Sequence, residues 1–336
     1  MADQRNLLLA IVISVAILMG FQLAFGPKPP IPDDQAGIEE PLRPPKVDKS
    51  SDRQNIDDLV AERMLVEAGP IEESRRILIN PEDPEAKVSG GIALRGAQID
   101  QITLGSYQES ISPDSPNIVL FSPRGTARPY VAEFGWVGGE GADVELPGPD
   151  SLWQSDGGTL TPRQPVILTW DNGAGLKFKR IISIDDDYMF TISDTIQNDG
   201  EGPVKLHPYG LIRRTHEPKT LGFFILHEGP IGVFNSELVE EDYDDIQDKS
   251  YSINADTGFF GITDKFWITS LIPQENRKFR ADFDYKNKFR TNFIETSATE
   301  IGANETKSNE IKILIAAKEV RVIDEYSKKL NIEKLD

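Results

Sequence analysis

The sequence predicts a mainly β protein: a large antiparallel β-sandwich with a transmembrane helix before it and an α-helix after it. Three observations support this prediction. Residues 7–25 form an uncharged apolar run, short β-branched runs of alternating polarity follow from Arg76 to Ala317, and helical periodicity returns after Ala317. Many short strands separated by turn residues are typical of a sandwich.

Residues 7–25 (LLLAIVISVAILMGFQLAF) are predicted to span a membrane. At about 1.5 Å rise per residue, this run spans roughly 28 Å, close to the hydrocarbon thickness of a bilayer. The alternative is a cleaved signal peptide, but such peptides have apolar regions of about 7–15 residues and end in a small-x-small site. Ala24-Phe25-Gly26 is a poor cleavage site. Because Arg5 precedes the span, residues 1–6 are predicted to be a cytoplasmic tail.

Residues 26–74 are predicted to be a largely disordered linker rich in proline and acidic residues. Seven prolines fall between Pro27 and Pro45, and such a composition cannot bury enough surface to offset its chain entropy. Within residues 55–68, apolar residues recur at helical spacing, which predicts a short amphipathic helix ended by Gly69-Pro70. The residues on this stripe are Ile56, Leu59, Val60, Met64 and Leu65.

Residues 75–317 are predicted to form the sandwich. The clearest hairpin joins residues 166–170 to a strand that begins at Leu176, through the turn Asp171-Asn172-Gly173. Leu176 and Phe178 then alternate with lysines, as in a half-buried strand. The other predicted strands are 76–79, 91–94, 99–104, 117–121, 130–137, 188–198, 203–213, 222–227, 266–273, 278–283, 288–294 and 308–317.

Asp194 interrupts an apolar stripe in the strand predicted over residues 188–198. We expect a local hydrogen bond or an edge position for this carboxylate, not a catalytic role. Residues 318–336 are predicted to contain the final helix, because Val320, Ile323, either Tyr326 or Ser327, and Leu330 form one stripe among charged residues.

Composition limits the possible functions. A net charge of −19 over 336 residues argues against nucleic acid as a partner and against electrostatic adhesion to anionic lipid headgroups. An acidic surface is typical of a large exported domain that stays soluble. The chain has no cysteine, which excludes disulfides, thiolate metal ligands and a thiol nucleophile.

The residues themselves predict no catalytic, cofactor or metal site. His207, His216 and His227 lie close in sequence but lack metal-ligand spacing such as HExxH. We expect ordinary strand-end or loop histidines, with acid–base catalysis by a His/Glu pair as the minor alternative. No Gly-x-Ser-x-Gly elbow, P-loop or dinucleotide fingerprint occurs.

Two other groups of residues are assigned structural roles. The acidic run 237–248 lacks the register of a calcium loop and is predicted to be a solvated loop. Core packing is expected for most of the aromatic residues, with a ligand cleft as the alternative. These aromatic residues are Phe134, Trp136, Trp153, Trp170, Trp267 and the pair Phe223-Phe224.

Several blocks of the sequence resemble the bacterial YidC membrane-protein insertases. They occur in the family's order along the chain: MADQRNLLLAIVIS, SPNIVLFSPRGT, VAEFGWVG, ELPGPDSLW, PVILTWDNGAGLKFKRIISIDDDYMFTI, HPYGLI, ILHEGPIGVF, GITDKFWI and AAKEV. Residues 55–74 match least well. The resemblance implies a first transmembrane helix with its N-terminus inside, then a large periplasmic β-supersandwich of the galactose-mutarotase type, closed by a C-terminal helix.

The resemblance also implies a function and partners. Such insertases integrate and fold inner-membrane proteins. Their substrates are nascent inner-membrane proteins, which arrive from the ribosome or with the Sec translocon, and some members contact the SecD/SecF complex. In the family, five further transmembrane helices form the insertase core, and no second apolar span follows here. We therefore expect an N-terminal part of an insertase that serves as anchor and interaction domain. The alternatives are a periplasmic carbohydrate-binding or mutarotase-like domain, and a periplasmic chaperone that holds emerging segments in an apolar cleft.

Overall fold

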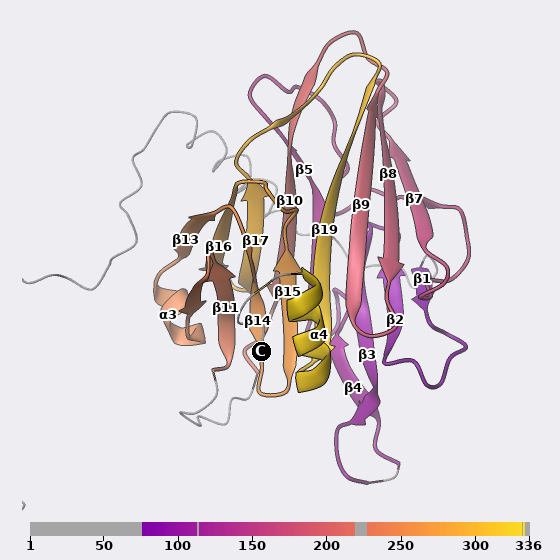
Figure 1. The fold of residues 1–336 in the computed structure, drawn as a ribbon. Helices are drawn as coiled ribbons and strands as arrows, with labels where there is room; N and C mark the ends of the chain where they lie inside the picture. The colour runs from indigo at the N-terminus through magenta and orange to yellow at the C-terminus, as the bar shows by residue number, and fades with distance from the viewer. Residues whose placement is uncertain (1–75, 113, 219–226, 331, 333–336) are drawn as a thin grey trace, which may run out of the picture. The chain divides into compact units, whose positions relative to one another are not determined.

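The computed structural model describes residues 76–112, 114–218, 227–330 and 332. Within these ranges the chain forms two large sheets that face each other (Figure 1). All pairings between their named strands are antiparallel. The predicted mainly β, antiparallel sandwich is therefore confirmed.

The ten-stranded sheet has the order β1-β2-β3-β5-β10-β17-β16-β13, with β4 paired to β3 and β18 paired to β10. Its strands are β1 (Arg76–Ile79), β2 (Val88–Ala93), β3 (Gln98–Gln108), β4 (Asn117–Phe121), β5 (Tyr130–Gly138), β10 (Val204–Arg214), β13 (Tyr251–Ala255), β16 (Phe279–Tyr285), β17 (Phe289–Glu295) and β18 (Thr299–Ile301).

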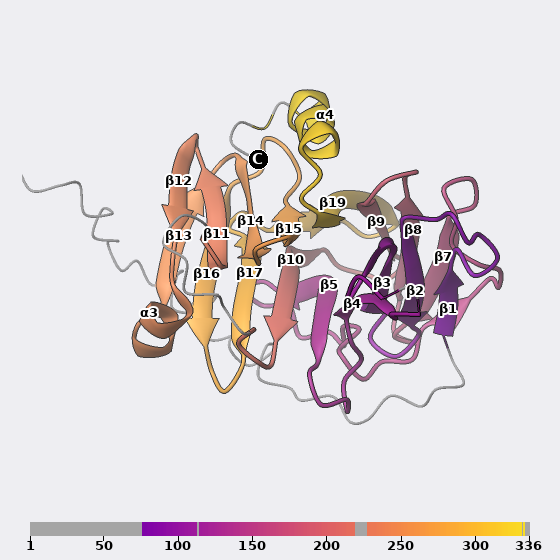
Figure 2. The same ribbon diagram turned by 90° about the horizontal axis from the view of Figure 1, so that it is seen from below.

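The nine-stranded sheet has the order β12-β11-β14-β15-β19-β9-β8-β7-β6. Its strands are β6 (Gln154–Ser155), β7 (Val166–Asp171), β8 (Leu176–Ile184), β9 (Met189–Asn198), β11 (Gly229–Phe234), β12 (Glu237–Glu240), β14 (Gly258–Thr263), β15 (Trp267–Ile272) and β19 (Glu305–Ala317). Figure 2 shows the two sheets nearly end-on, with α4 (Val320–Leu330) on the outer side of the nine-stranded sheet.

The predicted hairpin forms as expected between β7 and β8. Trp170 pairs with Phe178, and Asp171 pairs with Lys177. Gly173 supplies the positive φ of the turn, at 68°. The Asn172 side-chain oxygen accepts hydrogen bonds from the backbone N–H groups of Ala174 and Leu176, at 2.8 and 2.9 Å. Local turn chemistry thus sets the register of this pair.

Four neighbouring strands, β11 to β14, were not predicted. Glycines interrupt the patterns of β11 and β14 and suggest breaks, but in the structure they allow close backbone approach. The strands β12 and β13 contain no glycine and are only four and five residues long. At Gly261 in β14, an added Cβ would lie 1.8 Å from the Thr269 carbonyl oxygen, and at Gly258 (φ 145°) it would lie 2.0 Å from that of Val233. The strand predicted over residues 222–227 falls outside the described residues except at His227, which lies in no strand.

The core between the sheets is rich in phenylalanine at the end formed by β11, β14, β16 and β17. The Phe260 ring lies 5.6 Å from Phe234, 5.9 Å from Phe279 and 6.0 Å from Phe293, measured between centroids. Aromatic pairs at such separations add packing energy beyond their buried area. Both sheets contribute rings, so the cluster joins them.

The predicted final helix is confirmed as α4, which buries Val322, Ile323 and Tyr326. No helix within the described ranges is long and apolar enough to cross a bilayer. The predicted transmembrane helix over residues 7–25 and the linker 26–74, including its amphipathic stretch, lie outside the described residues.

Candidate functional site

The three histidines do not form a joint site. His207 in β10 lies 2.8 Å from the main-chain oxygen of Glu295, through Nδ1, and burial lowers the pKa of its ring. His227 Nε2 lies 3.0 Å from the carbonyl oxygen of Pro230. His216 has its pKa lowered by burial and by nearby Arg214. Each ring therefore has its own surroundings, as expected for structural histidines.

The acidic run 237–248 is not a solvated loop, so that prediction was wrong. Its first part is β12, and its last part is the helix α3 (Tyr243–Asp248), which buries Tyr243 and Ile246. These two apolar contacts hold the segment to the domain while its carboxylates face water. Within the described ranges, no group of three or more His, Asp or Glu side chains is placed to hold a metal.

Asp194 makes hydrogen bonds, as predicted, but the edge position offered as the other possibility was wrong. It lies in β9, an interior strand, and its carboxylate is buried. Arg180 from β8 donates to both of its oxygens at 2.7 Å, and Trp136 Nε1 from the opposite sheet donates at 3.0 Å. Arg180 also donates to the main-chain oxygens of Phe134 and Ala97, at 2.9 and 3.4 Å. This buried network links the sheets and holds Asp194 in a structural role.

Most of the singled-out aromatic residues pack in the core, as expected. Phe134, Trp136 and Trp153 are buried, and Trp170 and Trp267 pack against the core from partly buried positions. The pair Phe223-Phe224 lies outside the described residues. A groove of about 470 Å³ opens on the outer face of β7 to β9, but Lys177, Lys179, Thr195 and Gln197 line it alongside Trp170. Seven of its ten lining residues are polar or charged.

A polar cluster joins α4 to the sandwich. We call it the junction cluster; it consists of Lys87, Asp185, Asp187, Tyr188, Glu319 and Tyr326. Lys87 directly precedes β2, residues 185–188 form the turn between β8 and β9, and Glu319 directly precedes α4. Segments that are far apart in sequence therefore meet at one end of the domain.

Tyr326 is the central contact of α4. Its hydroxyl accepts hydrogen bonds from the backbone N–H of Tyr188 at 2.9 Å and of Met189 at 3.2 Å, and it donates to Asp185 at 2.9 Å. Burial, together with Asp185, raises the pKa of this hydroxyl far above its usual range. Tyr326 therefore stays protonated at neutral pH and can donate and accept at once.

Glu319 and Lys87 form the second part of the cluster. Lys87 Nζ lies 2.7 Å from Asp187 and 3.1 Å from Glu319, and the Tyr188 hydroxyl donates to Glu319. Burial opposes both charges, but the hydrogen bonds outweigh it: they raise the pKa of Lys87 and lower that of Glu319. Both groups are therefore held in their charged forms, and their hydrogen bonds fix the start of α4 to the sandwich.

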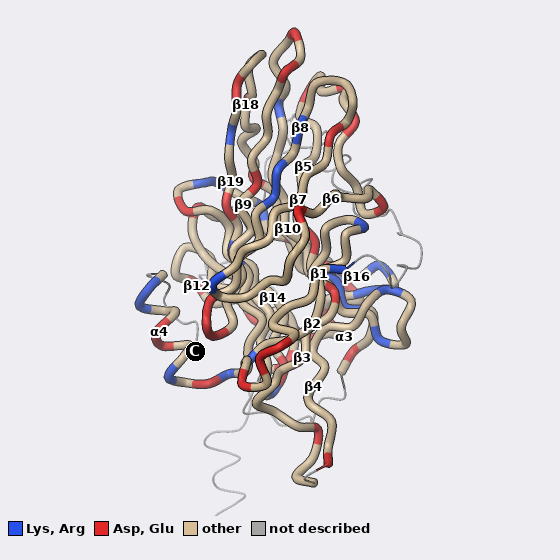
Figure 3. The backbone as a smooth tube through the Cα atoms, turned by 90° about the vertical axis from the view of Figure 1, so that its right-hand side faces the viewer, with Lys and Arg blue, Asp and Glu red and all other residues tan. Residues whose placement is uncertain are grey.

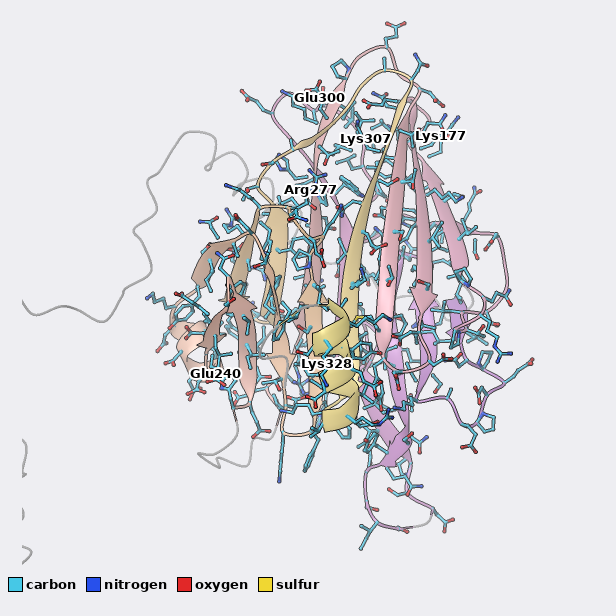
Figure 4. All side chains as sticks on the ribbon, in the orientation of Figure 1. Lys177, Glu240, Arg277, Glu300, Lys307 and Lys328 are labelled. Atoms are coloured by element: carbon cyan, nitrogen blue, oxygen red, sulfur yellow. The ribbon has the colours of Figure 1, made fainter. Side chains whose placement is uncertain are left out.

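Glu295, at the end of β17, has a carboxyl group that is fully buried. The residue is 0% exposed, and its carboxylate lies 3.4 Å from Nε of Arg277. Figure 4 labels Arg277. Burial raises the pKa of Glu295 to about 7, against the opposing effect of Arg277. His207 contacts the main chain of Glu295 and not its carboxylate, so the two do not form an acid–base pair.

We expect Glu295→Gln to flatten the pH dependence of stability. The pKa of Glu295 is higher in the folded domain than in the unfolded chain, so the folded domain binds the proton of this carboxyl group more tightly. The bound proton therefore stabilises the fold at low pH, and this stabilisation is lost as the pH rises through about 7. Near pH 8 the variant should be more stable than the parent by roughly 2 kcal/mol. Urea unfolding from about pH 5 to 8 measures this effect. The exposed Glu300→Gln (Figure 4) is the control, and an unchanged slope in Glu295→Gln would contradict the assignment.

Comparison with known proteins shows the family to which the chain belongs. A family described as "YidC periplasmic domain" matches residues 85–334. The "Membrane protein insertase YidC" of Pelagibacter ubique is 38% identical over 336 residues, covering 99% of this chain and 58% of that protein. The protein of the same name from Bradyrhizobium diazoefficiens is 34% identical, covering 100% of this chain and 59% of that protein.

The chain thus spans 58–59% of the length of these relatives. Among solved structures, a galactose mutarotase related enzyme from Lactobacillus acidophilus matches with a TM-score of 0.48 and 9% identity, over 71% of this chain and 97% of that one. A likeness at that level carries no functional argument, and the separate surroundings of the three histidines do not favour a mutarotase-like or carbohydrate-binding domain. Since the family match covers most of the chain and the relatives match nearly all of it, the chain belongs to the YidC membrane protein insertase family and carries its periplasmic domain.

Proposed function

We propose that this chain serves as membrane anchor and interaction domain in the integration and folding of inner-membrane proteins, alone or with the Sec translocon. The family match over residues 85–334 is the observation that supports this function. No catalytic role is proposed, because the titratable clusters of the described residues serve to fix strands and α4. The substrates would be nascent inner-membrane proteins, and SecD/SecF is the proposed accessory partner.

The proposed topology follows the composition of the chain. Residues 1–6 lie in the cytoplasm, residues 7–25 span the inner membrane, and residues 26–74 form a linker. Residues 75–317 form the periplasmic domain, and residues 318–336 lead from it through α4. The uncharged run of residues 7–25 and the preceding Arg5 support this orientation.

Because the chain has no cysteine, single cysteines can test the topology in living cells. We expect Glu240→Cys and Lys328→Cys, both at exposed positions (Figure 4), to react with a membrane-impermeant maleimide in intact cells. Asp3→Cys should react only after the inner membrane is opened. The reverse pattern, or recovery of the chain in the soluble fraction, would contradict the proposed topology.

A depletion experiment tests the functional role. In cells depleted of their insertase, this chain should reach the membrane but not restore growth, whereas a full-length relative should restore it. Rescue by the chain alone would overturn the proposal that it acts only as anchor and interaction domain.

A further inference from the structure

The outer face of the ten-stranded sheet, turned away from the nine-stranded sheet, carries unusual side chains. Ile212 and Phe134 belong to the main core, so their neighbours Leu211, Arg213 and Glu133 alternate to the outer face. In the register of β10, Leu211 pairs with Glu133 on one side and with Asn292 on the other, while Arg213 pairs with Arg290. We call this surface the arginine face. Its arginines are Arg76, Arg124, Arg213, Arg280 and Arg290.

An apolar cluster lies in the middle of the arginine face. Val137, Tyr209, Leu211 and Ile294 pack together, separate from the main core, and none is more than 4% exposed. Among the described elements, Figure 2 shows no helix or strand across this side, whereas α4 lies on the opposite side of the sandwich. Buried apolar side chains on an outer sheet face indicate a covering segment.

The ionic groups of the face are only partly satisfied by one another. Arg213 Nη1 lies 3.2 Å from Glu133, Arg124 pairs with the same carboxylate, and Arg76 pairs with Asp100. Yet, among the described residues, Arg213 Nη2 and Arg124 Nε and Nη1 are buried without a hydrogen-bond partner, and Arg213 is only 7% exposed. Buried guanidinium N–H groups that lack an acceptor are costly even when the group has one ion pair. They call for further acceptors, and carboxylates suit them best.

Residues 55–73 of the same chain have the matching chemistry. They contain six acidic residues and one arginine, and their apolar stripe includes Ile56, Leu59, Val60 and Met64. The chain then enters the sheet at Arg76 in β1, an edge strand of the same sheet. Figure 3 shows Lys and Arg positions near β1 and β16, on the side away from α4. The acidic residues of the segment therefore match the arginines of the face, and its apolar stripe matches the apolar cluster there.

The segment is long enough to reach the face. The distance from β1 to β10 is four strand spacings, or roughly 19 Å. The seven residues 69–75, when extended, span about 23 Å. A helix over residues 55–68 would span about 21 Å. We propose that residues 55–68 dock in cis on the arginine face, with the apolar stripe on Val137, Leu211 and Ile294 and the carboxylates on Arg213 and Arg124. This inference does not depend on the insertase role.

Cysteine pairs in the full chain test the docking, because the chain has no other cysteine. The test pair is Met64→Cys with Asn292→Cys, and the matched control pair is Met64→Cys with Thr195→Cys, on the outer face of the other sheet. Under mild oxidation we expect the test pair to form the intramolecular disulfide in about tenfold higher yield, equivalent to roughly 1.4 kcal/mol. Equal yields, or disulfides only between separate chains, would overturn the proposal.

A second series tests the charges without disturbing the core of the sandwich. In the chain with the test pair, we replace four acidic residues together by Asn or Gln: Asp57, Asp58, Glu62 and Glu67. The disulfide yield of the test pair should then fall severalfold and no longer depend on salt concentration. Lys307→Gln, at an exposed position in the nine-stranded sheet (Figure 4), is the control and should leave the yield unchanged. A yield insensitive to the four acidic residues would rule out their carboxylates as the partners of the arginine face.

Discussion

Asp194→Ala should lower the free energy of unfolding of the domain by about 3–5 kcal/mol, the cost of breaking a buried ion pair by removing one partner. Arg180 is 1% exposed, and without Asp194 its charge would keep two main-chain oxygens and the face of the Trp153 ring as partners, with no opposite charge. Trp136 Nε1 would also lose its acceptor. Chemical denaturation of the parent and the variant measures the difference.

Two controls separate the lost charge pair from lost packing. The double variant Arg180→Met/Asp194→Leu should recover most of the stability, because apolar residues of similar volume often replace a buried pair at little cost. Lys177→Gln removes an exposed pair with Asp199 and should change the free energy of unfolding by less than about 1 kcal/mol. A loss below that level in Asp194→Ala would show that the buried network contributes little.

Tyr326→Phe should destabilise the domain by about 2–3 kcal/mol and loosen α4, because buried N–H groups and Asp185 lose the hydroxyl between them. A helix of 11 residues is marginal without tertiary contacts. Amide exchange across residues 320–330 should therefore accelerate more than exchange in the central strands.

The control for Tyr326→Phe is Tyr285→Phe. The Tyr285 ring packs on Phe289 in the ten-stranded sheet, with 4.8 Å between centroids, and loss of its hydroxyl should leave α4 exchange unchanged. If Tyr326→Phe left the protection of α4 intact, apolar burial of Val322 and Ile323 alone would hold the helix.

Local patterns predicted the elements whose signals lie within a few residues. The β7–β8 hairpin, the long strand β9 and the helix α4 all follow from turn chemistry and periodicity. The stripe predicted for α4 was wrong at its first residue, because Val320 is 72% exposed and Val322 is buried instead. The strands β11 and β14 were missed because glycines that permit close backbone approach look like breakers in a single sequence. The strands β12 and β13 were missed because runs of four and five residues give little periodicity. Their place in the sheet depends on neighbours far along the chain.

A usable signal for the buried network was present in the sequence. Arg180 interrupts the apolar stripe of β8 at the position that pairs with Asp194, which interrupts the stripe of β9. Two opposite charges that break matched stripes of one hairpin predict a cross-strand pair. Trp136 and the Phe134 carbonyl, on the opposite sheet, carried no such signal.

Fold class, hairpin, final helix and family could all be inferred from the amino-acid sequence, because periodicity, turn residues and ordered sequence blocks are local properties of the chain. The burial of Asp194 against Arg180, the role of Tyr326 in fixing α4 and the five arginines on one outer face became evident in the folded domain alone. These features depend on strand order and register, which bring together side chains far apart in sequence, and burial then sets their energies.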